Sequence, residues 1–370
     1  MPLVSATVEC PVFASFRVAQ VAGMFDLAPA DRCRETFAVE VPGLDEPWQI
    51  GVIVGPSGSG KTTIARQAFG EALCSAAEWP TDRAVVDCLG ELPIKQLTRA
   101  FTAVGFGSPP SWVKPYHVLS NGEKFRCDLA RALLSRRPLV AFDEFSSVVD
   151  RAAAKIGAAA VANALHAGRF PRRFVAVTCH YDVVEWLQPD WVLDMATLSL
   201  ARGRLRRPPL RLEIVRCRRA AWRLFARHHY LSAELNRAAE CYLGTLDGEP
   251  AAFGAFLATI GRAGMRRVTR MVVLPDFQGI GVGGRFLDTV CEWVREQDRR
   301  VTITTSHPSM IAHLAHSRAW RIGRVSPAGR RRSRLTGRAN YRTSAGRPVV
   351  SAEFHAGAYP TARRQASGGR

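Results

Sequence analysis

The residues with the clearest chemistry form a glycine-rich stretch directly after the apolar run Ile50–Val54. Its pattern, G-x-x-x-x-G-K-[ST], is typical of a loop that wraps backbone N–H groups around nucleotide phosphates at a helix N-terminus. Lys61 would reach the β- and γ-phosphates, and the Thr62 hydroxyl would bind Mg²⁺. We therefore predict an ATP site made by Gly55, Ser57, Gly58, Ser59, Gly60, Lys61, Thr62 and Thr63.

Acidic and hydroxyl side chains that suit phosphate chemistry follow further along the chain. Asp143 and Glu144 end an apolar run, so one acid can hold Mg²⁺ while the next polarises an attacking water. His180 closely follows another apolar run. Ser120 and Gly122 open a helical pattern, where a hydroxyl and backbone N–H groups can meet an anion.

A second glycine-rich stretch stands between the apolar run 267–274 and the helical pattern 285–295. A lone G-x-G also fits an ordinary turn between strand and helix, but its backbone N–H groups can equally hold a pyrophosphate. Because a strand is expected before it and a helix after it, we favour the anion site. Its residues would be Val272, Val273, Gln278, Gly279, Ile280, Gly281, Val282, Gly283 and Gly284.

Length and composition indicate a chain of two α/β domains. The 370 residues exceed one ordinary core, and 47% apolar residues can fill two. No window approaches 18 uncharged apolar residues and the start lacks a signal-peptide pattern, so we expect a cytoplasmic protein with no membrane partner. The nine cysteines show no C-x-x-C spacing, which fits reduced thiols.

The net positive charge of the chain comes entirely from its second half. Residues 1–205 hold 21 Lys and Arg against 21 Asp and Glu, whereas residues 206–370 hold 30 Arg against 11 acids, the whole net charge of +19. A charge run is often only a solvated face. An asymmetry of this size, without an amphipathic lipid-binding stretch, favours a nucleic-acid partner, and we predict DNA.

Hydrophobic periodicity places secondary structure around these motifs. In the first half we expect a strand near Val39 and Val41, a strand at 84–87, and helices at 94–104 and 127–135. After a Pro-terminated linker at 202–209, Asp247-Gly248 predicts a hairpin turn. The second half is expected to hold strands at 210–217, 241–246, 251–259, 267–274, 301–304 and 349–354, and helices at 220–227, 285–295 and 309–317.

The order of phosphate loop, Leu-Ser-x-Gly-Glu motif, apolar-Asp-Glu and His resembles the ATP-binding-cassette (ABC) ATPases over about residues 15–205. The resemblance implies that Glu144 is the catalytic base, that His180 touches the γ-phosphate and that Asp150 is the D-loop acid. It also implies an ATP-dependent head-to-tail homodimer. In such a dimer Ser120 and Gly122 contact the γ-phosphate bound by the other subunit.

Two departures from the ABC pattern narrow the resemblance. Asn121 stands where the family usually has Gly. Only 58 positions separate Lys61 from Leu119, a short helical arm in which Gln96 is the one candidate we name for the family's Gln loop. With such an arm and no membrane spans, the chain looks like the soluble cassettes that act on nucleic acid. An aromatic such as Phe25 or Phe37 would stack on adenine.

The element order of the second half, with Gln-Gly-x-Gly-x-Gly opening a helix, resembles the GCN5-related N-acyltransferases (GNAT) over residues 210 to about 325. The resemblance implies that the loop 278–284 holds the pyrophosphate of acetyl-CoA or another acyl-CoA. The preceding strand, with Val272 and Val273, would bind the pantetheine arm. His229 and Tyr230 are candidates for base and acid, although buried structural roles suit them equally.

Within the GNAT enzymes, three short segments resemble the Mom-type phage enzymes that modify adenine in DNA. They are His-His-Tyr-Leu from His228, Val-Leu-Pro-Asp-Phe-Gln-Gly from Val273, and Thr-Ser-His-Pro from Thr305.

Beyond Trp320 the chain becomes Arg-rich, with Tyr341 interleaved, which suits phosphate contact and base stacking. We predict nucleic-acid contacts for Arg330, Arg331, Arg332 and Arg334.

Together these observations predict an ABC-type ATPase domain at 1–205, a GNAT-like domain at 206–355 and a disordered basic tail at 356–370. The expected function is ATP hydrolysis joined to N-acyl transfer on or beside DNA, with a base amine as the candidate acceptor. Two alternatives remain open. The acceptor could be a protein or small-molecule amine with ATP as a regulator, or the second half could only bind DNA in an ATP-dependent switch.

Overall fold

The structure is a computed structural model that describes residues 3–11, 13–25, 32–75, 78–229, 234–326 and 349–355. The chain forms two compact units, which we call the first and second unit. The first unit comprises residues 1–77, 135–148 and 165–207, and the second comprises 78–134, 149–164 and 208–370. The predicted two-part α/β class is confirmed, while the predicted domain boundaries stay a prediction. Contacts group two stretches of the first half, 78–134 and 149–164, with the second half.

The first unit contains a six-stranded sheet in the order β4-β5-β6-β3-β7-β8. Its strands are β3 Ile50–Val54, β4 Leu73–Cys74, β5 Leu139–Phe142, β6 Arg173–Thr178, β7 Trp191–Asp194 and β8 Ser199–Arg202. All neighbours are parallel except β7 and β8. Every residue of β3 and β5 is buried, which explains why they read as continuous apolar runs.

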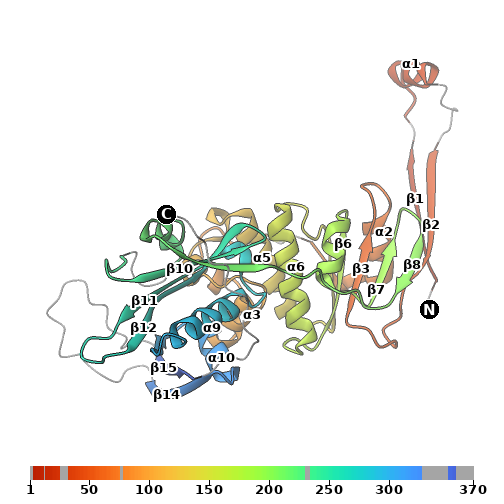
Figure 1. The fold of residues 1–370 in the computed structure, drawn as a ribbon. Coiled ribbons are helices and arrows are strands. Elements are labelled where there is room, and N and C mark those ends of the chain that lie inside the picture. The colour runs from red at the N-terminus through yellow and green to blue at the C-terminus, as the bar shows by residue number, and fades with distance from the viewer. Residues whose placement is uncertain are drawn as a thin grey trace. The chain divides into compact units, whose positions relative to one another are not determined.

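A long hairpin precedes this sheet in the first unit. Strands β1 Leu3–Pro11 and β2 Arg32–Glu40 pair antiparallel, and α1 Phe16–Met24 lies at the end of the hairpin (Figure 1). At its base, Val4, Phe37 and Val39 join the core that packs against α2 Lys61–Phe69. The predicted strand near Val39 therefore exists, with Val41 just beyond its end.

The second unit begins with a group of helices. They are η2 Val85–Asp87, α3 Ile94–Ala103, α4 Pro109–Trp112, η3 Tyr116–Val118, α5 Asn121–Leu134 and α6 Arg151–His166, of which residues 165 and 166 fall in the first unit. The predicted strand at 84–87 is wrong. The chain makes a single 3₁₀ turn there, and the buried Val85 bonds through its N–H to the carbonyl of Lys114 instead of a neighbouring strand.

The sheet of the second unit has seven strands in the order β14-β15-β13-β12-β11-β10-β9. They are β9 Leu212–Cys217, β10 Glu240–Leu246, β11 Glu249–Ala258, β12 Met265–Val273, β13 Arg300–Thr305, β14 Trp320–Ser326 and β15 Val349–Phe354. Only β12 and β13 run parallel. Helices α9 Val282–Arg295 and α10 Pro308–His316 agree with the predicted helices, and β10 and β11 confirm the hairpin at Asp247-Gly248.

Two elements of the second unit differ from the sequence-based expectation. The helix predicted at 220–227 is broken into η5 Arg219–Ala221, α8 Trp222–Phe225 and η6 Ala226–His228. Only one apolar turn, Trp222 and Phe225, is buried in the core, so packing supports no longer helix. Strand β14 was not predicted.

The remaining short elements are η1 Gly70–Ala72, η4 Tyr181–Val183, α7 Val184–Leu187 and η7 Pro275–Phe277. Among the residues described, no helix is both long and apolar enough to cross a membrane.

Candidate functional site

The phosphate loop connects β3 to α2 in the first unit, as predicted. Helix α2 begins after Gly60, whose φ of 78° is left-handed, and no side chain caps it. A β-carbon on Gly60 would also lie 2.7 Å from the Phe37 ring. Since the first N–H groups of a helix have no intrahelical acceptor, the loop offers them to an anion. The Phe37 ring is buried against this loop, whereas Phe25 is exposed beyond α1.

Side chains of the loop complete the cradle. The ammonium of Lys61 is largely buried and donates to the carbonyl of Pro56 at 2.6 Å. The hydroxyl of Ser59 is buried and has no hydrogen-bond partner among the described residues. An unsatisfied buried hydroxyl is unfavourable, so a phosphate oxygen would suit this position. Ser57 and Gly58 are exposed, and Thr62 and Thr63 are half-buried in the first turn of α2.

The two residues predicted to bind Mg²⁺ lie together. Thr62 Oγ1 donates to Asp143 Oδ1 at 3.1 Å, and Asp143 is buried at the end of β5. No cluster of three or more His, Cys, Asp or Glu side chains that could hold a metal occurs in the described part of the chain. One carboxylate and one hydroxyl fit Mg²⁺, which usually takes its other ligands from substrate phosphates and water.

Glu144 and His180 follow neighbouring strands of the same sheet, β5 and β6. The two strand ends are joined because Phe145 N–H donates to the Val177 carbonyl at 2.8 Å and Thr178 Oγ1 donates to the Phe145 carbonyl at 2.8 Å. Glu144 is exposed and has a left-handed φ of 53°, a strained conformation that is frequent at functional sites. Glu144 and His180 thus lie at the carboxyl-terminal ends of the parallel strands, as the phosphate loop does after β3.

The Leu-Ser-x-Gly-Glu motif forms the N-terminus of α5 in the second unit. Ser120 and Glu123 make a reciprocal capping box, in which Glu123 accepts from the Ser120 N–H and the Ser120 hydroxyl accepts from the Glu123 N–H. Burial raises the pKa of Glu123, but hydrogen bonds from Ser111 and Ser120 outweigh it and the pKa falls below its ordinary value. Asp150 caps α6, accepting from the Ala153 N–H, and its D-loop role stays a prediction.

The second glycine-rich loop joins β12 to α9, again as predicted. Gly281 precedes α9 with a left-handed φ of 90°, and no side chain caps the helix. A β-carbon there would meet no atom within 4 Å, so the N-terminus of α9 is open on that side. Gly283 and Gly284 serve packing, since β-carbons on them would approach Val273 and His313 closely. Val282 is buried, Ile280 is half-buried and Gly279 is exposed.

Next to this loop, strands β12 and β13 stop pairing with each other. The parallel pairing of β12 with β13 covers only Met265 to Val268, although β12 continues to Val273. Among the described residues, no strand pairs with this edge of β12 beyond Val268, so its backbone can accept an extended ligand. The side chain of Val272 is buried in a cluster with Trp222 and Phe253, so a pantetheine arm would meet the strand's main chain rather than this side chain.

The side chain of Gln278 bonds within the protein. Its Oε1 accepts from the Gly107 N–H at 2.6 Å, and its Nε2 donates to the Val273 carbonyl at 2.7 Å. His307 reaches the same segment, since its Nε2 donates to the Gly107 carbonyl at 2.9 Å. Sequence reasoning missed both contacts, because no pattern links residues so far apart.

The remaining candidates are placed only in part. His229 is half-buried and packs edge-on against Trp222, with ring centroids 5.7 Å apart. Tyr230 and Tyr341 lie outside the described residues, as do the tail 356–370 and Arg330, Arg331, Arg332 and Arg334.

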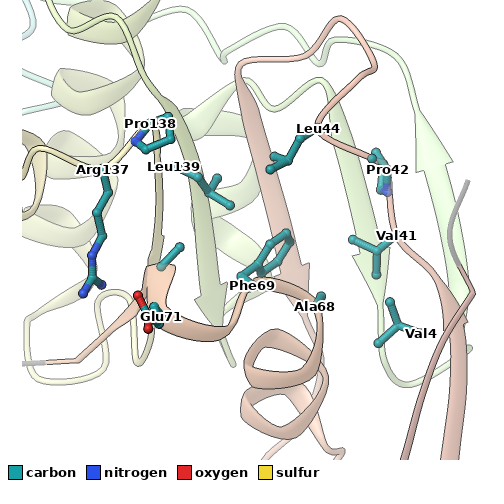
Figure 2. Close-up of a pocket in the computed structure, with 12 residues that line it drawn as sticks. Val4, Val41, Pro42, Leu44, Ala68, Phe69, Glu71, Arg137, Pro138 and Leu139 are labelled. Carbon is teal, nitrogen blue, oxygen red and sulfur yellow. The ribbon is translucent and has the colours of Figure 1, made fainter.

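A separate pocket of about 380 Å³ lies in the first unit (Figure 2). Its lining is mainly apolar and includes Val4, Leu44 and Phe69, with Glu71 and Arg137 on one side. It adjoins the C-terminal end of α2, whereas the phosphate loop is at the N-terminal end. None of the predicted site residues lines it.

A comparison with known protein families bears on the second half of the chain. Residues 205–318 match the model of the Acetyltransferase (GNAT) family, which confirms the predicted acetyltransferase fold there. No curated protein sequence matches the chain.

The solved structures that match parts of the chain include a bacterial Atm1-family ABC exporter with ATP bound, at 18% identity and a TM-score of 0.32. The similarity covers 44% of this chain but only 33% of the exporter. The dimeric bacterial ABC transporter cassette MJ0796 has 14% identity and a TM-score of 0.34, and the match covers 43% of this chain and 87% of the cassette. The ribosomal-protein-S18-alanine N-acetyltransferase from Escherichia coli has 14% identity and a TM-score of 0.31, and the match covers 40% of this chain and 97% of that enzyme.

Proposed function

We propose that the protein is an ABC-type ATPase joined to an acyl-CoA-dependent N-acyltransferase. One observation carries this proposal: α2 and α9 each follow a strand, begin after a left-handed glycine and have no side-chain cap. Each therefore presents unpaired N–H groups where a phosphate can bind. The first would take the phosphates of ATP, and the second the pyrophosphate of acetyl-CoA or another acyl-CoA.

At the ATP site, the residues divide the work of hydrolysis. Lys61 and the loop N–H groups hold the phosphates, and Thr62 and Asp143 would hold Mg²⁺, which neutralises charge on the phosphates. Glu144 accepts a proton as water attacks the γ-phosphorus, and the bond to the ADP oxygen breaks. His180 would hydrogen-bond the γ-phosphate. Closure of a head-to-tail homodimer would bring Ser120 and Gly122 of one subunit to the ATP of the other.

At the acyltransferase site, an acceptor amine would attack the thioester carbonyl beside Val272 and Val273. The C–N bond forms, the C–S bond breaks, and the electron pair leaves with the CoA sulfur. The amine loses a proton, for which His229 is our candidate base, and the sulfur gains one, for which Tyr230 is our candidate acid. The N-terminus of α9 holds the pyrophosphate throughout.

We propose DNA as the acceptor or its carrier, with an exocyclic base amine as the acylated group. The support is the charge of residues 206–370, which hold 30 Arg against 11 acids. Arg330 to Arg334 would contact phosphates, and the short Mom-type segments agree with a base substrate. ATP-driven closure would deform the duplex and lower the cost of exposing the base.

A direct test is to supply radiolabelled acetyl-CoA and Mg-ATP with duplex DNA, single-stranded DNA, a protein extract or polyamines. We expect label on DNA, faster with ATP on duplex than without, and less ATP-dependent on single strands. Gly281→Asp should remove the label, whereas Gly248→Asp, a glycine of the same φ at the β10–β11 turn, should not. Label only on protein lysines or polyamines would favour the second acceptor class, and DNA binding without transfer would favour a non-catalytic switch.

A further inference from the structure

Residues 278–284, which we call the acyl-CoA loop because of their proposed ligand, contact a segment that precedes the acetyltransferase match by about a hundred residues. Gln278 accepts from the Gly107 N–H at 2.6 Å, and a β-carbon on Gly279 would lie 2.9 Å from the backbone of Gly105. Ser309 Oγ donates to Thr102 Oγ1 at 3.3 Å. All these residues belong to the second unit. The loop's shape therefore depends on residues outside the acetyltransferase fold itself.

A buried cation makes a second connection to the same loop. Arg126 on α5 has a fully buried side chain, and its Nη1 lies 3.4 Å from Asp276 Oδ1, three residues before Gly279. Among described residues, no partner exists for its Nε and Nη2 atoms. Burial lowers the pKa of Arg126, and Asp276 opposes this only in part. A buried charge with one long ion pair is poorly satisfied, so its free energy changes steeply with small movements of helix or loop.

Both connections lead to the Leu-Ser-x-Gly-Glu motif. Arg126 lies one helical turn after Gly122, and Gly122 approaches it so closely that a β-carbon would be 3.2 Å from Nη1. Glu123 accepts from Ser111 Oγ at 2.7 Å and from the Ser120 hydroxyl at 3.1 Å. Ser111 is in α4, which directly follows the segment that holds Gln278. A change at the motif therefore reaches the loop through α5 and through α4.

We propose that Arg126 and Gly107 are positioning residues through which the ATP state of the motif sets the affinity of the acyl-CoA loop. The inference rests on the proposed function. When the motif is held by ATP in the closed dimer, α5 and the attached loop are held in one arrangement. The protein then loses less conformational entropy when acyl-CoA binds, so ATP tightens the binding of acyl-CoA. By linkage, acyl-CoA tightens ATP binding by the same factor.

The test is calorimetric titration of acetyl-CoA into the full-length Glu144→Gln protein, with and without Mg-ATP. We expect the Kd to fall at least about 5-fold with ATP, the lower end of ordinary coupling. Adding Asp276→Asn should bring that ratio close to 1. Asp298→Asn, an exposed acid of the same unit, should keep it. Arg126→Met should also abolish the ratio and Arg126→Lys should restore part of it, which a merely structural role would not produce.

Equal Kd values with and without ATP in the Glu144→Gln protein would overturn the inference. So would an unchanged ratio in both the Asp276→Asn and Arg126→Met proteins. If the proposed function itself is wrong, the result will be different. The protein will then fail to bind acetyl-CoA both with and without ATP, or it will not bind ATP at all.

Discussion

The N-termini of α2 and α9 use one backbone device in two different settings. Both follow a strand, both begin after a glycine with φ near 80–90°, and neither has a side-chain cap. The phosphate loop, residues 55–63, which we call the ATP loop because of its proposed ligand, adds the buried Lys61 and the Ser59 hydroxyl, and its Thr62 pairs with Asp143 after β5. The acyl-CoA loop has no cation, and its one long polar side chain, Gln278, bonds to Gly107 and Val273.

This difference indicates where each site gets its strength. At the ATP loop, the buried Lys61 and the proposed metal ligands belong to the loop or to an adjacent strand end, so single side chains should dominate binding and chemistry. At the acyl-CoA loop, we propose that backbone N–H groups hold the pyrophosphate, so the shape of the loop and the residues that support this shape should matter most. The predictions below test that contrast.

The largest effect is expected at Glu144. Glu144→Gln keeps the side-chain shape but removes the base, so ATP hydrolysis should fall about 10²–10⁴-fold while ATP still binds. The ATP-loaded protein should accumulate as a dimer in sedimentation with Mg-ATP. Glu185→Gln, an exposed acid of the same unit, should hydrolyse ATP normally. A strict monomer with unchanged turnover would contradict the ABC assignment.

Next in size is the loss of Lys61. Lys61→Ala removes charge-assisted hydrogen bonds to phosphate worth about 1.5–3 kcal/mol, so ATP affinity should fall on the order of 10- to 150-fold. Equilibrium titration with a fluorescent ATP analogue measures it. The matched control is Lys95→Ala, an exposed lysine of α3. If both variants bind ATP equally well, the ATP loop depends on its backbone as much as the acyl-CoA loop does.

A smaller effect is expected at Gly281. Gly281→Asp places a repelling carboxylate at the open N-terminus of α9, and acetyl-CoA should bind about 10-fold more weakly or worse. Gly281→Ala adds mainly left-handed strain of about 1–2 kcal/mol, which free and bound protein share, so its affinity should change less. Gly248→Asp controls for the strain, since its φ is also 90° and its surroundings are also open. Calorimetry that finds equal affinity in all three would make the loop a mere turn.

These contrasts were only partly visible in the sequence. The strand-loop-helix order at Gly60 and at Gly281 was predicted because the glycines stand directly between an apolar strand and a helix, all within local sequence. The end of β5 at Asp143 and Glu144 followed from the same kind of signal. The prediction failed where contacts distant in sequence determine the secondary structure. Val85 has strand propensity, but its N–H bonds to the carbonyl of Lys114 and the chain forms a 3₁₀ turn. Residues 220–227 form only short turns around the buried Trp222.

The support of the acyl-CoA loop was beyond sequence reasoning. The bond between Gly107 and Gln278 spans 171 positions, and the pair of Arg126 and Asp276 spans 150. No periodicity or motif encodes such pairs. Gln278 was predicted as a ligand contact from its place in the motif, while its side chain in fact bonds within the protein. Its predicted role in acyl-CoA binding therefore depends on its backbone and stays a prediction.

The last prediction extends the contrast to the charges of the two halves. If about six Arg of residues 206–370 contact DNA phosphates, log K against log[salt] should fall with a slope near −5, since about 0.9 ions are released per contact. Replacing Arg330, Arg331, Arg332 and Arg334 by Ser should flatten the slope by about 3–4 units. The matched control replaces four exposed arginines of residues 1–205, namely Arg83, Arg99, Arg136 and Arg169.

Duplex binding measured by fluorescence anisotropy at several salt concentrations decides this point. The control should keep the slope, because residues 1–205 carry equal numbers of cations and acids. Gly281→Asp should also leave DNA binding intact while removing acyl transfer, since the α9 N-terminus would hold acyl-CoA and not DNA. Binding that does not respond to salt, or an equal loss of slope in both quadruple variants, would argue against DNA as the specific partner of the second half. A protein or small-molecule amine would then be the better acceptor.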